Sequence, residues 1–349
     1  MPNPVLTRAI DAVASRRDLS QQEAAEVLAE IMHGDVSETQ IAGFLIALRT
    51  KGETVQELAG LAATMRGLAA HVPSERDDLL DTAGTGGGRR TFNVSTTAAL
   101  VAAGAGCAVA KHGNRSATSS SGSADLLEAL GARIDLGPEA VARCIEEAGF
   151  GFMFAPAHHR ATRFVVPVRS ELAVRTIFNF LGPLTNPAGA SRQLIGVADA
   201  SFMGTIAGAL ARLGVHRALV VAGEDGLDEV SSSAATRVIE VNGEELQSYS
   251  LTPRDVGIEL ADSSDPLLGG GSPSENAAVT RAVFEGEQGP RADLVLINAG
   301  AAIYAGGAAD SIADGVEAAR AAIASGAALG ALESYVQASL RHAPEQVSR

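Results

Sequence analysis

The segment Leu79-Leu-Asp-Thr-Ala-Gly-Thr-Gly-Gly-Gly88 joins a short apolar run to a glycine-rich loop. We expect a buried strand at Leu79–Asp81 and a helix from Thr96 to Ala105, so the loop lies between a strand and a helix. Glycines in that position let backbone N–H groups approach a phosphate near the helix N-terminus. Arg89 occupies the last position of a dinucleotide-binding fingerprint and no Gly-Lys-Ser/Thr follows, so neither that motif nor a P-loop is present. On its own, the loop also fits a plain turn.

Strand and helix patterns alternate along the chain after this loop. We expect strands at Cys107–Ala110, Arg217–Ala222 and Asp293–Asn298, the last two being apolar runs typical of strands buried on both faces. Helical patterns lie between and after them, at Asp125–Gly131, Phe202–Leu213 and Ala313–Ser325. This alternation predicts an α/β domain, residues 73–349, with helices on both faces of a sheet.

Before this domain, the chain has only helical patterns. Three capping boxes begin at Ser20, Ser37 and Thr54, each with Glu or Gln three residues later. Apolar residues at helical spacing follow each one, so each predicted helix has one face to bury. We assign residues 1–72 to a small helical domain with a packing or dimerisation role, because no catalytic cluster occurs there.

The composition limits the class of protein. The chain has 349 residues, 46% of them hydrophobic and only 4% aromatic, and a formal net charge of −14. This length suffices for about two domains with aliphatic cores, and general disorder is excluded. The acidic balance argues against a nucleic-acid or anionic-membrane surface and, at face value, against an anionic substrate. Two cysteines are too few for a disulfide framework, and neither a signal peptide nor a membrane span is apparent, so we expect a cytoplasmic protein.

The charges are nevertheless sorted along the chain. Residues 82–124 contain four cations and no acid, and residues 151–198 contain five arginines and one acid, Glu171. The other segments contain 18 cations and 40 acids. Such segregation is expected for an anion site in an acidic protein, with chance clustering as the alternative.

Three polar segments lie where an α/β fold would place a site. Thr91–Thr96 has an amide and hydroxyls that could cap a helix, donate to phosphate or bind Mg²⁺. Lys111–Ser116 follows a buried strand and combines two cations, a histidine, an amide and a hydroxyl, which is typical of a ligand-binding loop. His112 alone is equally consistent with a structural histidine. Asp228-Glu229 could hold one or two Mg²⁺ ions that clamp a pyrophosphate, although adjacent surface carboxylates are common.

Taken together, these segments resemble the anthranilate phosphoribosyltransferase family over nearly the whole chain. The resemblance rests on Gly84-Thr-Gly-Gly, Thr91-Phe-Asn-Val-Ser-Thr, Lys111-His-Gly-Asn-Arg, Gly122-Ser-Ala-Asp, Arg175-Thr-Ile-Phe-Asn-Phe-Leu-Gly-Pro-Leu-Thr-Asn-Pro187 and Asp228-Glu-Val. The third and fifth of these motifs are highly specific, and the order and spacing of all six agree with the family.

The resemblance implies a nucleoside-phosphorylase-like fold. A small N-terminal all-helical domain, completed by helices within about residues 160–190, would adjoin a larger α/β domain with a central, mostly parallel sheet. The implied reaction transfers phosphoribose from phosphoribosyl pyrophosphate (PRPP) to the amine of anthranilate, in tryptophan biosynthesis. One or two Mg²⁺ ions per subunit and a homodimer through the helical domain are also implied.

The resemblance assigns the site residues as well. The PRPP-binding positions are Gly84, Gly87, Gly88, Thr91, Asn93, Val94, Ser95, Thr96, Lys111, His112, Gly113, Asn114, Arg115, Ser116, Ala117, Thr118, Ser119 and Ser123. The anthranilate-binding positions are Gly84, Asn114, His159 and Arg169, the last meeting the substrate carboxylate. The Mg²⁺ ligands are Ser95, Asp228 and Glu229. No residue is a dedicated nucleophile or general base, and Lys111 and Arg169 assist.

The chain departs from the family pattern in its first loop. The family usually has Gly-Thr-Gly-Gly-Asp there, whereas Gly88 stands at the position of the Asp and the stretch up to Thr91 is one residue shorter. A carboxylate that would help organise PRPP and Mg²⁺ is therefore missing, and Arg89 and Arg90 enter instead. We expect retained activity with altered Mg²⁺ dependence. Arg160 also replaces the usual proline after His159.

Two other functions are compatible with the motifs. A pyrimidine nucleoside phosphorylase shares the fold and also needs a phosphate loop. A non-catalytic paralogue that kept the fold and binds nucleic acid or a partner would explain Gly88, but the intact Asp228-Glu229 pair and the acidic exterior argue against it.

Overall fold

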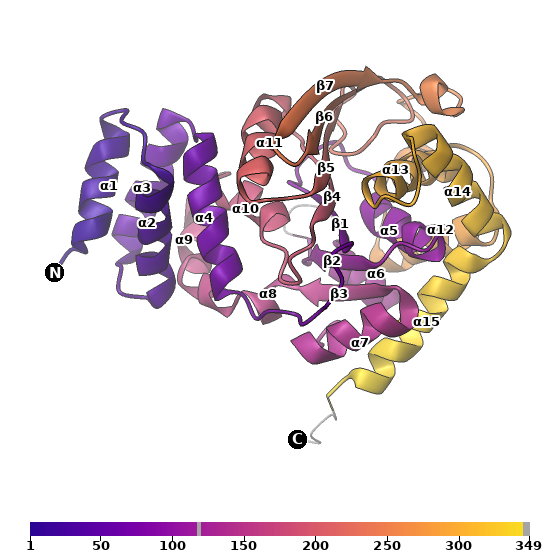
Figure 1. Cartoon of the computed structure of the whole chain (residues 1–349), viewed down its shortest axis with the longest axis horizontal. Helices are drawn as coiled ribbons and strands as arrows, with labels where there is room; N and C mark the ends of the chain where they lie inside the picture. The colour runs from indigo at the N-terminus through magenta and orange to yellow at the C-terminus, as the bar shows by residue number, and fades with distance from the viewer. Residues whose placement is uncertain (117–119, 345–349) are drawn as a thin grey trace.

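The structure, a computed structural model that describes residues 1–116 and 120–344, has a helical layer beside an α/β unit (Figure 1). The α/β unit contains a seven-stranded sheet with the order β3-β2-β1-β4-β5-β6-β7. The strands are β1 Leu80–Gly84, β2 Val109–Gly113, β3 Phe150–Phe154, β4 Arg192–Gly196, β5 Arg217–Gly223, β6 Thr236–Asn242 and β7 Glu245–Leu251. Strands β1 to β5 pair in parallel, and β6 and β7 extend the sheet antiparallel. The predicted fold class, a helical domain plus an α/β domain with a mostly parallel sheet, is confirmed.

The central strands are buried on both faces, as their continuous apolar runs predict. Along β4 and β5 the side chains alternate between two cores. Leu194, Leu219 and Val221 belong to the core on one face, whereas Ile195 and Val220 belong to the core on the other. The sheet therefore separates two apolar layers, each of which needs its own cover of helices.

Helices cover the first face in one block (Figure 1). Its core joins α5, α7, α13, α14 and α15 to the sheet. The helices of this block are α5 Val94–Gly104, α6 Ser123–Ala129, α7 Pro138–Ala148, α12 Pro273–Phe284, α13 Pro290–Ala305, α14 Ile312–Ala324 and α15 Ala327–His342. Because α5 is apolar on every side and buried from Val94 to Ala103 except at its second residue, Ser95, it lies in the middle of this layer.

The second core joins the sheet to the N-terminal helices. These are α1 Pro4–Ala14, α2 Gln21–His33, α3 Glu38–Lys51 and α4 Val55–Leu68, and α9 Val166–Leu172, α10 Phe178–Leu184 and α11 Met203–Arg212 contribute to the same core. The short helix α8 Ala155–His158 follows β3 directly. Residues of α9 and α10, such as Val168 and Phe180, are buried in the same cluster as those of α1–α4. The helical layer is therefore built from two distant parts of the sequence.

Two of the three predicted capping boxes are complete. Ser20 with Glu23 and Thr54 with Glu57 make both reciprocal bonds. Ser37 accepts from the N–H of Gln40, but the Gln40 side chain binds the backbone of Asn3 instead of returning to Ser37. That glutamine ties α3 to the start of α1.

One strand prediction is wrong. Asp293–Asn298 lies within helix α13, which runs from Pro290 to Ala305. A short apolar run fits a buried strand or a buried helix equally well, and length decides between them. Here the apolar run continues through Ala299–Ala305, and all residues from Leu294 to Ile303 are buried. Proline at the first helical position and an alanine-rich second half favour the helix.

No helix within residues 1–116 and 120–344 is long and apolar enough to cross a membrane. Cys107 and Cys144 are free and buried, as expected for small apolar core residues.

Candidate active site

Parallel strands bring the predicted binding segments to one edge of the sheet. Strands β1, β2 and β5 end at Gly84, Gly113 and Gly223, and parallel pairing puts these carboxyl ends at the same edge of the sheet, with β4 between β1 and β5. We call residues 84–88 the glycine loop, residues 111–116 the basic loop and residues 223–235 the acidic loop. The glycine loop, the basic loop and the acidic loop thus lie at the carboxyl ends of three strands of one parallel array.

The glycine loop is held from two sides. On the sheet side, the N–H of Thr85 donates to the carbonyl of Gly196 at 2.9 Å. On the side of the helical layer, Arg175 donates from Nη2 to the carbonyl of Gly87 at 2.9 Å. A Cβ at Gly87, where φ is +86°, would lie 1.7 Å from that guanidinium nitrogen. Arg49 of α3 donates to the carbonyl of Arg175 at 2.8 Å, which connects the helical layer to this contact.

The glycine loop also lies directly against the acidic loop. A Cβ at Gly88 would be 2.5 Å from Oδ1 and 2.8 Å from the backbone nitrogen of Asp228. A Cβ at Gly84 would be 3.2 Å from Oδ2 of the same aspartate. The departure at position 88 therefore coincides with a point where this backbone has no room for a side chain.

Lys111 is a buried cation between the basic loop and the start of α5. Only 1% of the residue is exposed. Its Nζ donates to the carbonyl and hydroxyl of Thr82 and lies 3.5 Å from Oγ of Ser95. Burial lowers the pKa of Lys111, while Asp81 and Glu229 act in the opposite direction. The predicted PRPP-binding lysine and the predicted Mg²⁺-binding serine are therefore neighbours.

The Asp228-Glu229 pair is partly buried and strongly perturbed. Burial and, to a smaller extent, the neighbouring carboxylate of Asp228 together raise the pKa of Glu229 to about 8, against the opposing effect of Lys111. Burial also raises the pKa of Asp228. Two adjacent carboxylates that disfavour their own charge are suited to a cation.

The donor set fits Mg²⁺ better than a tightly chelated metal. Within the described residues, no group of three or more His, Cys, Asp or Glu could hold a metal ion. Mg²⁺ commonly uses one or two carboxylates and completes its shell with waters and substrate phosphates. Two carboxylates beside a serine hydroxyl match that pattern.

Three buried histidines lie close together, His112 in the basic loop and His158 and His159 at the end of α8. The rings of His112 and His159 have their centroids 5.0 Å apart, and Nδ1 of His112 lies 3.2 Å from the carbonyl of Gly182. Burial lowers the pKa of His112 to about 3 and that of His159 to about 4. His158 lies beside them with Nδ1 3.2 Å from the carbonyl of Ala70, and burial lowers its pKa too. The rings of His112 and His159 are therefore neutral at pH 7.

The other predicted residues are placed as follows. Arg169 lies on α9 with its guanidinium 5.6 Å from the ring centroid of Phe178, and burial lowers its pKa. Asn93 does not cap α5; its side chain binds Ser121 and Asn276. Val94 and Thr96 are buried in α5, Thr91 precedes it, and Ser123 begins α6.

The far end of the basic loop bends back onto α6. Arg115 pairs with Asp125 at 2.8 Å and with Glu128 at 2.5 Å, and Asp125 also accepts from the N–H of Ser116 at 3.2 Å. Asn114 accepts from the N–H of Arg115 at 2.7 Å. The predicted positions Ala117, Thr118 and Ser119 lie outside the described residues.

Two buried polar residues that were not among the predicted site residues, Asp81 and Asn186, hold the start of the basic loop in place. Asp81 is fully buried and accepts from the N–H of His112 at 3.1 Å and from Nδ2 of Asn186 at 2.8 Å. Asn186 also donates to the carbonyl of Ala110 at 2.8 Å and accepts from the N–H of Ala188 at 2.9 Å. An aspartate at the end of an apolar strand is the signal that could have found them, because a buried carboxylate needs partners.

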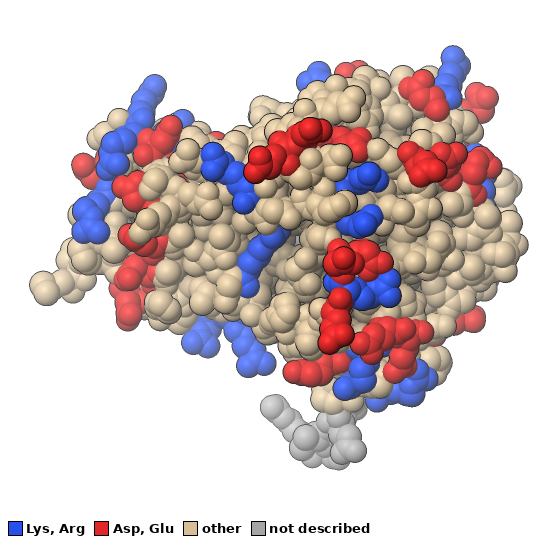
Figure 2. Space-filling model, viewed as in Figure 1, with Lys and Arg blue, Asp and Glu red and all other residues tan. Residues whose placement is uncertain are grey.

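The net charge belongs largely to the exterior. On the face shown in Figure 2, acidic side chains form a stripe over the β6–β7 hairpin, where Glu244 and Glu245 are exposed. Lys111, in contrast, is buried at the centre of the site. The expectation that an acidic chain avoids anionic substrates therefore does not apply to this edge of the sheet.

Comparison with known proteins gives one consistent result. Two family models match: the helical bundle domain of a glycosyl transferase family over residues 7–69, and the a/b domain of the same family over residues 76–329. The anthranilate phosphoribosyltransferase of Rubrobacter xylanophilus is 52% identical over 97% of this chain and 98% of its own length. That of Chloroflexus aggregans is 52% identical over 96% and 98%.

Solved structures agree with the sequence relatives. The anthranilate phosphoribosyltransferase of Thermus thermophilus superimposes with a TM-score of 0.89 at 48% identity, covering 95% of this chain and 99% of that one. The Saccharomyces cerevisiae enzyme in complex with PRPP and Mg has a TM-score of 0.87 at 28% identity, covering 96% and 98%. The chain therefore belongs to the anthranilate phosphoribosyltransferase family.

Proposed function

We propose that this chain transfers the 5-phosphoribosyl group of PRPP to the amine of anthranilate, giving N-(5-phosphoribosyl)anthranilate and pyrophosphate. The observation that carries the proposal is the convergence of the glycine loop, Lys111 and the Asp228-Glu229 pair at one edge of the sheet. Membership of the family supplies the identity of the two substrates.

The residues divide the binding of PRPP between them. Backbone N–H groups of the glycine loop and the N-terminus of α5 would meet phosphate oxygens, and Lys111 would add a desolvated positive charge. Asp228, Glu229 and Ser95 would hold one or two Mg²⁺ ions. When bound, Mg²⁺ neutralises charge that develops on the leaving pyrophosphate.

Anthranilate would lie on the side of the neutral histidines and α9. Arg169 would bind the substrate carboxylate through a charge-assisted contact, because a partly buried guanidinium favours a planar anion. Gly84, Asn114 and His159 would complete this subsite. An aryl amine is uncharged at pH 7, so these neutral side chains orient it without removing a proton first.

No side chain serves as a covalent nucleophile in this proposal. The difficult step is departure of pyrophosphate from C1 of the ribose, and electrostatic stabilisation of that group together with positioning of the amine would provide the catalysis. His112 and His159, with pKa values of about 3 and 4, are poor bases at neutral pH.

The organisation around the site belongs to the same proposal. Residues 1–72, with the helices within about residues 160–190, would form the helical domain and residues 73–349 the α/β domain. A homodimer through the helical domain and a cytoplasmic location would suit a biosynthetic enzyme with small soluble substrates.

The test is the loss of anthranilate fluorescence in the presence of PRPP and Mg²⁺. The proposal predicts PRPP-dependent decay, with no phosphorolysis of thymidine or uridine by the same preparation. Phosphorolysis without anthranilate consumption would favour a nucleoside phosphorylase, and neither activity would favour a binding paralogue.

A further inference from the structure

We propose that Arg89 is a positioning residue that fastens the glycine loop to the acidic loop, and so fixes the distance between the PRPP phosphates and the Mg²⁺ carboxylates. The inference rests on the proposed function of these two loops. Arg89 follows Gly88 directly and is absent from the residues assigned to either substrate or metal.

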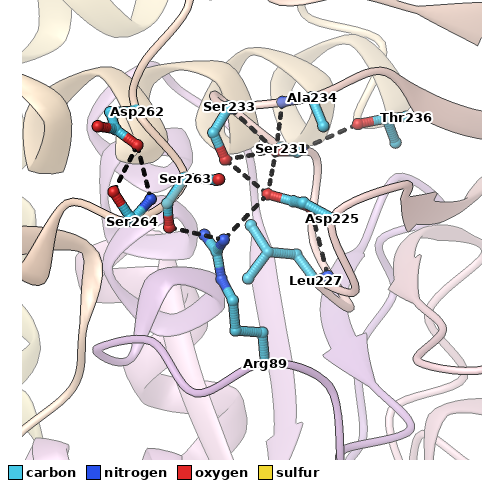
Figure 3. A network of polar contacts seen from close by, with 10 residues as sticks. All are labelled: Arg89, Asp225, Leu227, Ser231, Ser233, Ala234, Thr236, Asp262, Ser263 and Ser264. Atoms are coloured by element: carbon cyan, nitrogen blue, oxygen red, sulfur yellow. Dashed lines mark hydrogen bonds and ion pairs between the residues drawn. The ribbon is translucent and has the colours of Figure 1, made fainter.

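Two kinds of contact join Arg89 to the acidic loop. Its backbone N–H donates to the carbonyl of Gly226 at 2.8 Å. Its guanidinium Nη1 lies 3.4 Å from Oδ2 of Asp225 and donates to the carbonyl of Ser263 at 3.0 Å (Figure 3). One residue therefore connects the glycine loop to the acidic loop and to the segment around Ser263.

The partner of Arg89 is itself fixed. The side chain of Asp225 is 8% exposed, and its Oδ2 accepts from the hydroxyls of Ser231 at 2.9 Å and Ser233 at 2.6 Å (Figure 3). Its Oδ1 lies 3.4 Å from the N–H of Leu227. Because three donors fix the position of the Asp225 carboxylate, the guanidinium of Arg89 pairs with it in one defined geometry.

The position of this contact makes it relevant to the metal site. Asp225 lies three residues before Asp228, and Arg89 lies next to Gly88, whose Cβ position is 2.5 Å from Oδ1 of Asp228. Because Gly88 has no side chain, it cannot itself hold the two loops together. Arg89 and Arg175 hold the glycine loop on either side of Gly88. Arg89 bonds to the acidic loop and Arg175 bonds to the carbonyl of Gly87, so together they set the distance between Gly88 and Asp228.

Removing the contacts of Arg89 should loosen both loops. The side chain of Arg89 is 29% exposed, so loss of its ion pair should shift the equilibrium between closed and open loops about two- to fivefold toward open and should not unfold the protein. PRPP and Mg²⁺ bind across both loops and should lose affinity, whereas anthranilate would bind on the side of α9 and should be little affected.

The experiment compares Arg89→Met and Asp225→Asn with Arg133→Met. Arg133 pairs with Asp135, outside all three loops, and so controls for loss of an exposed ion pair. Hydrogen exchange of peptides covering residues 84–90 and 223–235 is measured in the unliganded protein. PRPP binding with Mg²⁺, without anthranilate, is measured by calorimetry.

We expect exchange in both peptides to accelerate about two- to fivefold and the Kd of PRPP to rise by a similar factor in the first two variants. Arg89→Lys should restore part of both effects, Arg133→Met should show neither, and the KM for anthranilate should change less than about twofold. Unchanged exchange and unchanged PRPP affinity in Arg89→Met would overturn the inference. If the wild-type protein binds no PRPP while exchange still accelerates in Arg89→Met, the proposed function is refuted, but the inference that Arg89 connects the two loops stands.

Discussion

Replacing Gly88 by Asp would restore the carboxylate that the family usually has in the glycine loop, yet the structure predicts that it impairs the enzyme. A Cβ at this position would lie 2.5 Å from Oδ1 and 2.8 Å from the backbone nitrogen of Asp228, and both distances are shorter than real Cβ contacts show. The loop would have to shift, and a displacement of about 1 Å in a positioned group can cost about 100-fold in rate.

The charge of the new side chain adds to the steric effect. Two carboxylates about 4 Å apart repel by about 4 kcal/mol at an effective dielectric constant of 20. The pKa of Glu229 is already raised to about 8, partly by Asp228, so a third acid would make this region still harder to ionise. Together these effects predict a loss of at least about 100-fold in kcat/KM for PRPP in Gly88→Asp. Gly88→Ala, which adds only the Cβ, should lose about tenfold.

The assay is the initial rate at several fixed Mg²⁺ concentrations, for the wild-type chain and both variants. Circular dichroism confirms that the variants are folded. If Gly88→Asp matched or exceeded the wild-type rate, or lowered the Mg²⁺ concentration needed for half-maximal activity, the packing of the glycine loop against Asp228 would be wrong.

Three further predictions follow from other parts of the site. Arg169→Ala should raise the KM for anthranilate at least about tenfold more than the KM for PRPP, and equal effects on both would contradict the assignment. Asn186→Ala should lower the free energy of unfolding in urea by about 3 kcal/mol, because the buried carboxylate of Asp81 and the carbonyl of Ala110 each lose a donor; a change below about 1 kcal/mol would show that water replaces the amide. Burial of His112 lowers its pKa to about 3, so the contribution of the neutral ring to stability is complete above about pH 6.5 and falls as the pH drops toward 3. Between pH 7 and pH 5 the free energy of unfolding of the wild type should therefore fall by about 2 kcal/mol more than that of His112→Gln. Urea midpoints that change equally in the two proteins would refute this.

The sequence was sufficient for the parts of this protein in which local chemistry and local structure agree. The glycine loop and the acidic pair each follow a strand and Lys111 lies two residues before the end of another, and a parallel sheet must gather such strand ends at one edge. The capping boxes at Ser20 and Thr54 likewise depend only on residues within one helical turn. Such features can be predicted because no distant segment decides them.

What the sequence did not predict depends on distant packing. The run Asp293–Asn298 is helical because its surroundings bury α13 on every side, which no pattern within six residues reveals. Asn186 contacts Asp81 only because the fold brings the segment after α10 against β1 and β2, where the amide of Asn186 bonds to Asp81 and to the carbonyl of Ala110. Arg89 meets Asp225 across 136 positions of chain, and neither residue belongs to a recognisable motif.

The net charge of −14 illustrates the same distinction. As a sum over the chain it describes an acidic exterior, including the exposed β6–β7 hairpin (Figure 2). The binding edge is determined by a few residues with their own surroundings, above all a lysine that is 1% exposed. Composition therefore bears on partners that would bind the whole surface, but it is a poor guide to a substrate proposed to bind at one edge of the sheet.

The transfer of phosphoribose from PRPP to anthranilate is tested most directly by the stoichiometry of the reaction. Purified protein is mixed with anthranilate, PRPP and Mg²⁺, and anthranilate fluorescence and released pyrophosphate are followed in the same samples. We expect one pyrophosphate for each anthranilate consumed, loss of both signals with EDTA, and a large reduction of both in the double variant Asp228→Asn, Glu229→Gln. Pyrophosphate release that does not require anthranilate, or no consumption of anthranilate by folded protein, would contradict it.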